Sequence, residues 1–434
     1  MLLPIFTACL TPMASSDLST DVSNSDVSNP SEDAEQTDEA LCEDEALSQA
    51  AEGAFIAQDT SALAHRDACT STMHATAGAT GSTLAITLTQ WDGAEAATLY
   101  VTDLLGAALT EPGPVNAGEA IEVSLVQSGE ILLHLEPTDP EMPANDYTLT
   151  VHCIDDCEAA YTRYPVVLMH GLGGSEAFGD SSYFYQVREA LEPEGYAFSS
   201  PSVSPFATTE VRAGEWEAHL QQLIDEGVGR RFNLISHSQA GLDARYLASG
   251  LGRSNWIASI VSIGTPHYGT PIADLITGAI ELQLIDDDWI DFGADVFITI
   301  FGLTGEDNSL VESMGALTTE TLEAFNQNVL DHDEVYYASW AGMTCGIFDL
   351  DCQDACGGET VDPTLAISNL ILELYGDEND GLVIIESAEW GDYQGVICAD
   401  HADQVGMFED SPTEAFDHLA FYRDELERLA ELGF

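Results

Sequence analysis

The stretch Phe232–Ser249, FNLISHSQAGLDARYLAS, decides the fold. Its first part is a mostly apolar run that predicts a buried strand, and its last part predicts a helix. Between them Ser238 occupies a turn with small residues two positions before and after it, Ser236 and Ala240. Strand, sharp turn and helix form the context of a nucleophile elbow, whose usual form has glycine at both small positions. Here each adds a Cβ, which strains the turn; the alternative is a serine that only caps the helix.

Segments on both sides of this stretch repeat the pattern of a strand followed by a helix. Tyr164–Met169 (YPVVLM) and Ile257–Ile263 (IASIVSI) are apolar runs of the kind found in strands covered on both faces. Residues 213–227 place large apolar side chains on one helical stripe, and residues 412–432 predict a C-terminal amphipathic helix. This alternation indicates an α/β domain with a mostly parallel sheet over residues 158–434.

A glycine-rich loop, His170–Gly174 (HGLGG), comes directly after the YPVVLM strand. With a nucleophile elbow, such a loop supplies one backbone N–H of an oxyanion hole, and the residue after the nucleophile supplies the other. We therefore expect Leu172 and Gln239 to be the two donors. The alternative is a phosphate cradle, but the loop lacks the Lys-Ser/Thr pair of a P-loop.

The charge balance is strongly acidic: the 434 residues include 76 Asp and Glu, ten Arg and no Lys, giving a net charge of −66. Such a chain is an unlikely partner for nucleic acid or an anionic membrane surface, both of which need clustered cations. Its hydrophobic fraction of 45% is that of a globular protein. Carboxylates spread along the whole chain repel one another unless salt screens them. We hypothesise adaptation to a salty medium, with plain solubility as the alternative.

The nine cysteines indicate an oxidising compartment. Cys9 ends an apolar stretch that resembles a lipoprotein signal, although no basic residue precedes it; a cleaved secretory signal and a meaningless apolar start are the alternatives. The other eight fit disulfides, with Cys42–Cys69 and Cys153–Cys157 suggested by proximity. The pairing stays open, and zinc is the rival hypothesis, for the remaining four, Cys345, Cys352, Cys356 and Cys398.

The N-terminal part of the chain reads as two regions. Residues 1–78 are rich in Ser, Thr, Ala, Asp and Glu, which predicts a signal remnant followed by a disordered acidic linker. Residues 79–157 contain short β-rich runs separated by turn clusters, which predicts a small antiparallel β-sandwich. His134 and His152 fall on these runs and are interpreted as ordinary strand residues.

From about residue 160 to the C-terminus the chain resembles the bacterial true lipases, the secreted triacylglycerol lipases of the Pseudomonas and Burkholderia type. The resemblance implies an α/β-hydrolase fold with a helical lid and a Ser, Asp, His order of catalytic residues along the chain. It rests on segments that occur in the family's order: YPVVLMHGLGGS, AGEWEAHLQQLI, FNLISHSQAGLDARYLAS, IASIVSIGTPHYGTPIADL, FNQN at 325–328, YYASWAG at 336–342, VDP at 361–363, NDGLV at 379–383 and DHADQV at 400–405.

The resemblance assigns the remaining catalytic residues. The family's acid falls in its NDG motif, here Asp380, and its histidine falls in the segment matched by DHADQV, here His401. Both lie in loop-like sequence, where catalytic groups usually sit. Ser238 would attack an ester carbonyl, His401 would move its proton, and Asp380 would orient the imidazole. The competing histidines have weaker local contexts: His418 in a helix, His332 in an acidic turn, His237 beside the nucleophile and His267 in TPHYG.

The family also carries a structural calcium near the histidine loop, which implies Asp403 as one ligand and Asp362 as the nearest second candidate. Two ordinary acidic residues are the alternative in a chain this acidic. Residues 270–304 match the family's lid and contain many large apolar side chains, which suit a lipid interface; buried packing helices are the alternative. The family further implies a dedicated folding chaperone as a candidate partner.

These observations together predict a secreted or cell-surface serine lipase or esterase that acts on acylglycerols, with a neutral lipid or ester met at a lipid–water interface as its substrate. A carboxylesterase or polyester hydrolase with the same three residues is one alternative. A non-catalytic surface-binding protein on a hydrolase scaffold is another, supported by the departure from the usual elbow sequence.

Overall fold

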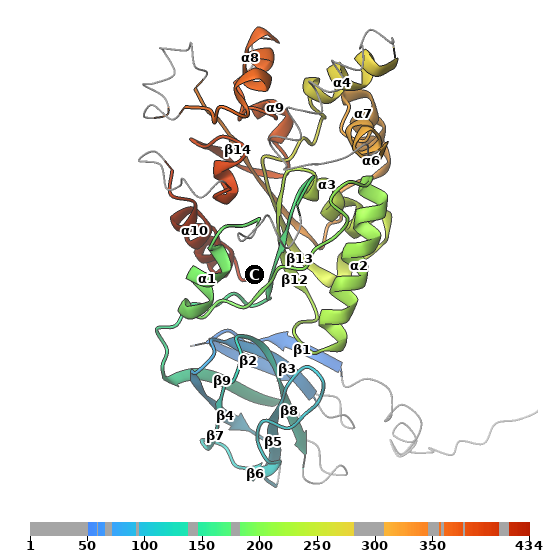
Figure 1. Ribbon diagram of the computed structural model, residues 1–434. Helices are drawn as coiled ribbons and strands as arrows, with labels where there is room; N and C mark the ends of the chain where they lie inside the picture. Colours follow the sequence, from blue (N-terminus) through green and yellow to red (C-terminus); the bar gives the residue numbers. More distant parts are fainter. Residues whose placement is uncertain are drawn as a thin grey trace, which may run out of the picture. The chain divides into compact units, whose positions relative to one another are not determined.

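The computed structural model describes eleven stretches of the chain, which Figure 1 colours along the sequence. The anchor candidate Cys9, most of the expected lid at 270–304, and Cys42, Cys69 and Cys352 lie outside them. No helix in these stretches is long and apolar enough to cross a bilayer. The described residues are 51–58, 60–65, 72–92, 95–137, 146–174, 183–281, 308–345, 356, 360–375, 378–407 and 416–434.

Two sheets form the N-terminal part of the described chain. Their inward side chains, among them Leu84, Leu99, Leu133 and Leu149, are fully buried and make one apolar core. Apart from the parallel pair β1–β3, the strand pairs are antiparallel. One sheet has the order β1(Ala51–Phe55)-β3(Thr72–Gly78)-β8(Gly129–Pro137)-β5(Ala97–Thr102)-β6(Gly113–Val115), and the other β2(Thr60–His65)-β9(Asp146–Asp155)-β4(Thr83–Trp91)-β7(Ala120–Ser124).

The expected boundary at residue 79 is placed too late, because β1, β2 and β3 all precede it. Their sequences, AEGAF, TSALAH and TMHATAG, consist largely of small and hydroxyl-bearing residues. Such residues resemble a linker in composition and have little strand preference of their own, so their strand conformation comes from the strands they pair with. β3, for example, pairs with β8 along its whole length, from Thr72 opposite Leu135 to Gly78 opposite Gly129.

The C-terminal part is built on a six-stranded sheet in which every neighbouring pair is parallel. The α/β-hydrolase architecture expected for residues 158–434 is therefore confirmed. The continuous apolar runs YPVVLM, FNLIS and IASIVSI are its central strands. The order is β11(Phe198–Ser199)-β10(Val166–Met169)-β12(Phe232–His237)-β13(Ile257–Ile263)-β14(Tyr336–Gly342)-β15(Asp392–Ile397).

Helices cover both faces of this sheet, because alternate strand residues point to opposite sides. On β10, Val166 and Leu168 join one apolar cluster, which includes side chains of α1(Val187–Leu191) and α10(His418–Glu431). Val167 and Met169 join another, which includes side chains of α2(Thr209–Asp225) and α3(Ala240–Arg245). This two-sided burial explains why the strands read as unbroken apolar runs. Further helices are α4(Pro271–Glu281), α6(Asn308–Gly315), α7(Thr319–Asn328), α8(Ala366–Tyr375) and α9(Ile385–Ala388).

The described cysteines are in disulfides, which disfavours the zinc alternative. Cys153 pairs with Cys157 as proximity suggested, and Cys356 pairs with Cys398, a pairing that the sequence left open. Cys345 is also disulfide-bonded. The Cys356–Cys398 bridge ties the residue after β15 to a segment 42 residues earlier.

Nearly every arginine in the described stretches lies within salt-bridge distance of a carboxylate. The exception is Arg231, which donates to the carbonyl oxygens of Ile257 and Glu334. Most of the described arginines therefore pair with a particular carboxylate. The pairs are Arg163–Glu130, Arg188–Glu192, Arg212–Asp243, Arg230–Glu130, Arg245–Asp331, Arg253–Glu217, Arg423–Glu194 and Arg428–Glu425.

Candidate active site

Ser238 sits in the sharp turn between β12 and α3. Its φ of +58° is rarely adopted by residues other than glycine and costs on the order of 1–3 kcal/mol. The turn is held by the Ser238 backbone N–H, which donates to Ile263 O at 2.9 Å. Ser236, which replaces the usual glycine, fits because its hydroxyl donates to the Val261 carbonyl of β13 at 3.0 Å. The departure from the usual elbow sequence therefore leaves the elbow geometry intact.

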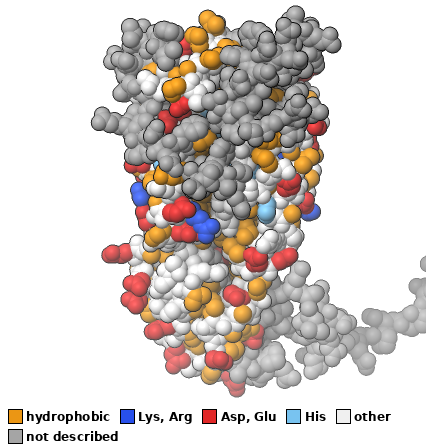
Figure 2. All heavy atoms as spheres, viewed as in Figure 1, with side chains coloured by type: hydrophobic (Ala, Val, Ile, Leu, Met, Phe, Trp, Pro, Cys, Tyr) orange, Lys and Arg blue, Asp and Glu red, His pale blue; other side chains and the backbone are white. Residues whose placement is uncertain are grey.

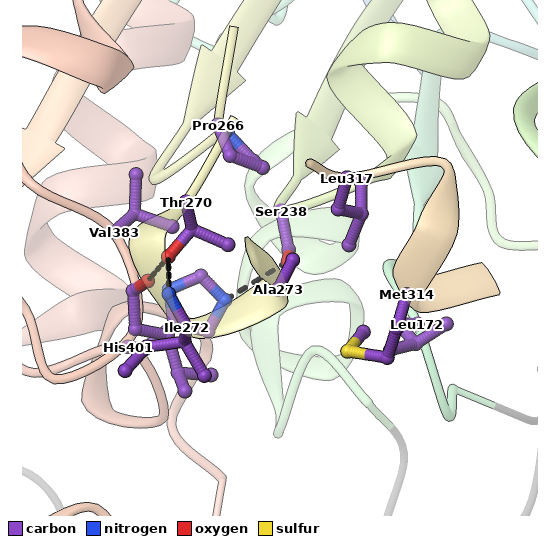
Figure 3. Close-up of a pocket in the computed structure, with 11 residues that line it drawn as sticks. Leu172, Ser238, Pro266, Thr270, Ile272, Ala273, Met314, Leu317, Val383 and His401 are labelled. Atoms are coloured by element: carbon purple, nitrogen blue, oxygen red, sulfur yellow. Dashed lines mark hydrogen bonds between the residues drawn. The ribbon is translucent and has the colours of Figure 1, made fainter. Parts of the chain in front are cut away.

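The structure brings Ser238, His401 and Asp380 together in one hydrogen-bonded row. The Ser238 hydroxyl oxygen is 2.9 Å from His401 Nε2, and His401 Nδ1 is 2.7 Å from Asp380 Oδ2 (Figure 3 draws the first of these bonds). Asp380 is fully buried, whereas Ser238 retains 8% of its surface. The row thus runs from the protein interior to an accessible hydroxyl, the arrangement that lets an imidazole take a proton from a nucleophile.

Two backbone groups fix the carboxylate of Asp380. Its Oδ1 accepts hydrogen bonds from the N–H groups of Leu382 and Val383, at 2.9 and 2.7 Å. The backbone of His401 in turn donates to the Asp380 carbonyl at 2.8 Å. Because Oδ1 is occupied, Oδ2 is the oxygen that accepts from the imidazole. Nδ1 of His401 therefore carries the proton, and Nε2 of His401 is free to accept one.

The predicted oxyanion donors lie on either side of Ser238. Within the described stretches, neither the Leu172 N–H nor the Gln239 N–H has a hydrogen-bond acceptor. Gly171 makes the approach possible, because a Cβ there would lie 2.7 Å from the Ser238 Cβ and 2.9 Å from His237 O. Arg212, buried and paired with Asp243, donates to the His170 carbonyl and so fixes the start of this loop.

Ser238 and His401 open into a pocket with mostly apolar walls (Figure 3). Its lining comes from the oxyanion loop, the loop after β13, helices α4 and α6, and the loop after Asp380. Sequence reasoning assigned no role to most of these residues, since apolar side chains carry no motif. The remaining lining residues are Leu172, Pro266, Thr270, Ile272, Ala273, Met314, Leu317, Leu382 and Val383.

The expected calcium site combines two carboxylates, Asp403 and Asp362, with carbonyl oxygens, and the structure leaves it untested. No group of three or more His, Cys, Asp or Glu side chains in the described residues is arranged to hold a metal ion. Asp362 Oδ1 is occupied by the Thr364 N–H and hydroxyl. The neighbouring Asp400, which sequence reasoning did not single out, accepts the N–H groups of Asp362, Ala402 and Asp403. The described carboxylates thus organise the histidine loop, and calcium stays a prediction.

The competing histidines have other partners. His267 bonds Ser262 Oγ and lies beside the buried guanidinium of Arg245, in agreement with a structural role. His418 lies at the start of α10 and bonds the Tyr185 carbonyl. His237 faces away from the serine, although its ring centroid lies 4.5 Å from that of His401.

Three buried histidines are expected to lower the stability of the folded protein as the pH falls. Burial lowers the pKa of His170 to about 3 and holds the pKa values of His237 and His267 well below the usual value of 6.5. Each stays neutral when folded but gains a proton when unfolded below about pH 6.5, at about 1.4 kcal/mol per pH unit. Burial raises the pKa values of Asp243 and Asp400 to about 6, which opposes this trend below pH 6.

We therefore expect the free energy of unfolding, measured by urea titration, to fall as the pH is lowered from 7, most steeply between pH 6.5 and 6. A rise over that half unit would contradict the assignment of the three histidines as neutral. Substituting one of them by glutamine should make the slope shallower by about one proton.

Comparisons with known proteins find similar sequences and structures among ester hydrolases. The family model described as palmitoyl protein thioesterase matches residues 165–290. A triacylglycerol lipase of Vibrio cholerae is 28% identical over 65% of this chain and 93% of its own length. One from Pseudomonas fragi is 27% identical over 64% and 99%. The structure of a Bacillus licheniformis lipase in mature form is 20% identical with a TM-score of 0.46, over 62% of this chain and 92% of that one. The chain is a carboxylic ester hydrolase with the α/β-hydrolase fold, related in sequence to the bacterial triacylglycerol lipases.

Proposed function

We propose that the chain is a serine lipase that hydrolyses acylglycerol esters through an acyl-enzyme. The observation that carries this proposal is the row Ser238–His401–Asp380, which ends at a hydroxyl in an apolar pocket. The sequence relatives named triacylglycerol lipase support the ester class and the glyceride substrate.

The chemistry follows from the positions of the donors and acceptors. Ser238 Oγ attacks the ester carbonyl carbon while His401 Nε2 takes the hydroxyl proton. The carbonyl oxygen becomes an oxyanion and accepts the N–H groups of Leu172 and Gln239, each worth about 3 kcal/mol in the transition state. Asp380 stabilises the imidazolium. When the tetrahedral intermediate collapses, the C–O bond to the alcohol breaks and His401 returns the proton to the departing oxygen.

Water then completes the reaction by the same steps. His401 Nε2 takes a proton from a water molecule, whose oxygen attacks the acyl carbon of the ester on Ser238. The second tetrahedral intermediate uses the same two N–H groups. Its collapse releases the fatty acid and returns the proton to Ser238 Oγ.

The pocket suits an acyl chain. Ile272, Ala273, Met314 and Leu317 line the pocket, and these side chains present no charge or hydrogen-bonding group. Burial of each CH2 of a substrate chain against such walls contributes about 0.8 kcal/mol. Each CH2 group of an acyl chain that enters the pocket therefore adds to binding.

An exposed apolar face beside the pocket supports action at a lipid surface. Ile367, Leu370 and Leu374 of α8 are 43%, 38% and 80% exposed and lie at helical spacing on one side. Leu275 of α4, a helix that contacts α8 and lines the pocket, is 47% exposed. Figure 2 shows hydrophobic side chains where α8 lies in Figure 1. In a chain of charge −66 such a face fits a neutral lipid surface.

Replacing Leu370 and Leu374 together by serine should lower the rate on an emulsified long-chain triacylglycerol by about tenfold, since about 1–2 kcal/mol of interfacial binding is lost. The rate on a soluble short-chain ester should not change. Leu432→Ser, at a leucine near the C-terminus whose exposure of 51% lies between those of Leu370 and Leu374, is the control. Equal losses on both substrates would contradict the assignment of this face to the interface.

Relative rates on three substrates test the proposed function: a long-chain triacylglycerol emulsion, a soluble short-chain ester and a polyester film. A lipase prefers the emulsion, whereas a preference for the soluble ester or the film would favour one of the enzymatic alternatives. Covalent labelling of Ser238 by an organophosphate would exclude the non-catalytic alternative. Secretion, lipidation at Cys9, a folding chaperone, calcium at Asp403 and Asp362 and dependence on molar salt stay predictions, of which the last two can be tested in the same assay.

A further inference from the structure

Gln404 belongs to η5(Asp403–Val405) and is fully buried next to Asp380. Its Nε2 donates to Asp380 Oδ2 at 2.8 Å, the oxygen that also accepts from His401. Its Oε1 accepts from His237 Nε2 at 3.2 Å. Gln404 thus joins the catalytic acid candidate to a second buried imidazole.

The sheet leaves a slot for this amide. Gly264, which follows β13, and Gly342, which ends β14, lie against it: a Cβ at Gly264 would overlap Oε1, and one at Gly342 would overlap Nε2. Gly264 also has a positive φ of +55°, which favours glycine. Two neighbouring strand ends therefore keep open a space that the Gln404 amide fills.

The hydrogen-bonded side chains continue from His237 to Tyr183. The Tyr183 hydroxyl and His237 Nδ1 are hydrogen-bonded at 2.7 Å. Burial raises the pKa of Tyr183, while a hydrogen bond from the backbone of Gly171, in the oxyanion loop, acts in the opposite direction. Burial first, and then the nearby His401, lowers the pKa of His237, which keeps this ring neutral beside an imidazole that must become charged.

These contacts fix the orientation of the Gln404 amide. Asp380 Oδ2 can only accept, so the NH2 group of Gln404 faces it and Oε1 faces His237. Nε2 of His237 then carries the proton and donates to Oε1, with the His401 backbone as a second partner of this ring, and Nδ1 is left to accept from the Tyr183 hydroxyl. The opposite amide orientation would set oxygen against oxygen and N–H against N–H.

We propose that Gln404 is a positioning residue for ester hydrolysis, and that His237 and Tyr183 hold its amide in the orientation that fixes Asp380 Oδ2 toward His401. The inference rests on the proposed function. A hydrogen bond to an ionised carboxylate that is lost in the interior typically corresponds to about a 10- to 100-fold change. The loss should appear in kcat, because the amide does not line the substrate pocket.

The experiment compares Gln404→Met with Tyr422→Phe in the full chain. Methionine keeps the length and volume of glutamine but offers no donor. Tyr422→Phe removes a hydrogen bond of 3.2 Å to the Gln404 backbone carbonyl and leaves the amide untouched, so it controls for loosening of the loop. The readouts are kcat and KM on a soluble ester, the melting temperature, and the downfield proton resonance of His401 Nδ1–H, recorded without substrate.

We expect Gln404→Met to lower kcat about 10- to 100-fold, to change KM less than about twofold, and to move the His401 resonance. Tyr422→Phe should leave all three near wild type. Tyr183→Phe removes the hydroxyl that is hydrogen-bonded to His237. It should give a smaller loss of kcat and a shift of the same resonance. This second variant keeps the test decisive if Gln404→Met does not fold.

Unchanged kcat and an unmoved resonance in Gln404→Met would overturn the proposal. So would equal losses in Gln404→Met and Tyr422→Phe that follow their melting temperatures, since these would show a purely structural role. The proposed function fails separately, if the wild type hydrolyses no ester or Ser238→Ala retains its rate; the resonance, which needs no turnover, still decides the role of Gln404.

Discussion

Ser238→Ala should lower kcat for ester hydrolysis by about 10⁴- to 10⁶-fold, because no other hydroxyl lies 2.9 Å from His401 Nε2 in the described site. Without Oγ no acyl-enzyme forms, and the residual rate comes from the oxyanion donors and His401 acting on water. The fold should be kept, since the Ser238 backbone holds the turn: its N–H donates to the Ile263 carbonyl and its carbonyl accepts from the Thr265 hydroxyl. The measurement is the burst and steady-state rate on a chromogenic ester.

Ser262→Ala is the control for Ser238→Ala. Ser262 is a buried serine on the neighbouring strand β13, bonded to His267 and to the Ala338 carbonyl. It should lose stability but keep turnover per folded molecule. Wild-type turnover in Ser238→Ala, with the protein confirmed by mass, would place the nucleophile elsewhere.

Asp380→Asn should lower kcat by roughly 10⁴-fold at neutral pH. The two backbone N–H groups of Leu382 and Val383 require an acceptor, so the amide oxygen takes the place of Oδ1. The NH2 group then faces His401 Nδ1 and Gln404 Nε2, where three donors meet and no acceptor remains. His401 is driven to the tautomer with its proton on Nε2, which cannot accept from Ser238.

Asp331→Asn is the matched control for Asp380→Asn. Asp331 also accepts hydrogen bonds, from Trp390 Nε1, but it lies at a partly exposed position outside the row. Its replacement should leave kcat near wild type. A loss of less than about tenfold in Asp380→Asn would mean that another carboxylate orients the imidazole.

The sequence predicted the elements whose burial leaves a clear pattern. β10, β12 and β13 are covered on both faces, so they read as unbroken apolar runs, and the elbow could be placed to the residue. β1, β2 and β3 were missed because their small residues take their strand conformation from pairing with distant strands. Local composition contains no trace of such partners.

The site divides in the same way. Ser238, Asp380 and His401 were named because they lie in motifs, and the structure brings all three within hydrogen-bonding distance. Gln404 and Asp400 were not, although both are fully buried beside them. In this acidic sequence no motif distinguishes a buried glutamine or aspartate from an exposed one. Its meaning depends on which backbone and side-chain groups the ends of neighbouring strands bring to it, and a linear pattern does not record this.

The chain pairs several of its carboxylates with arginine and contains no lysine, which has a practical consequence for chemical labelling. Each described guanidinium already contacts a carboxylate or carbonyl oxygens, and the sequence contains no lysine. A single lysine introduced at an exposed site, for instance by Leu432→Lys, would be the chain's only side-chain amine. Amine-directed dyes, cross-linkers or solid supports would then attach through a side chain at one chosen point, in one orientation.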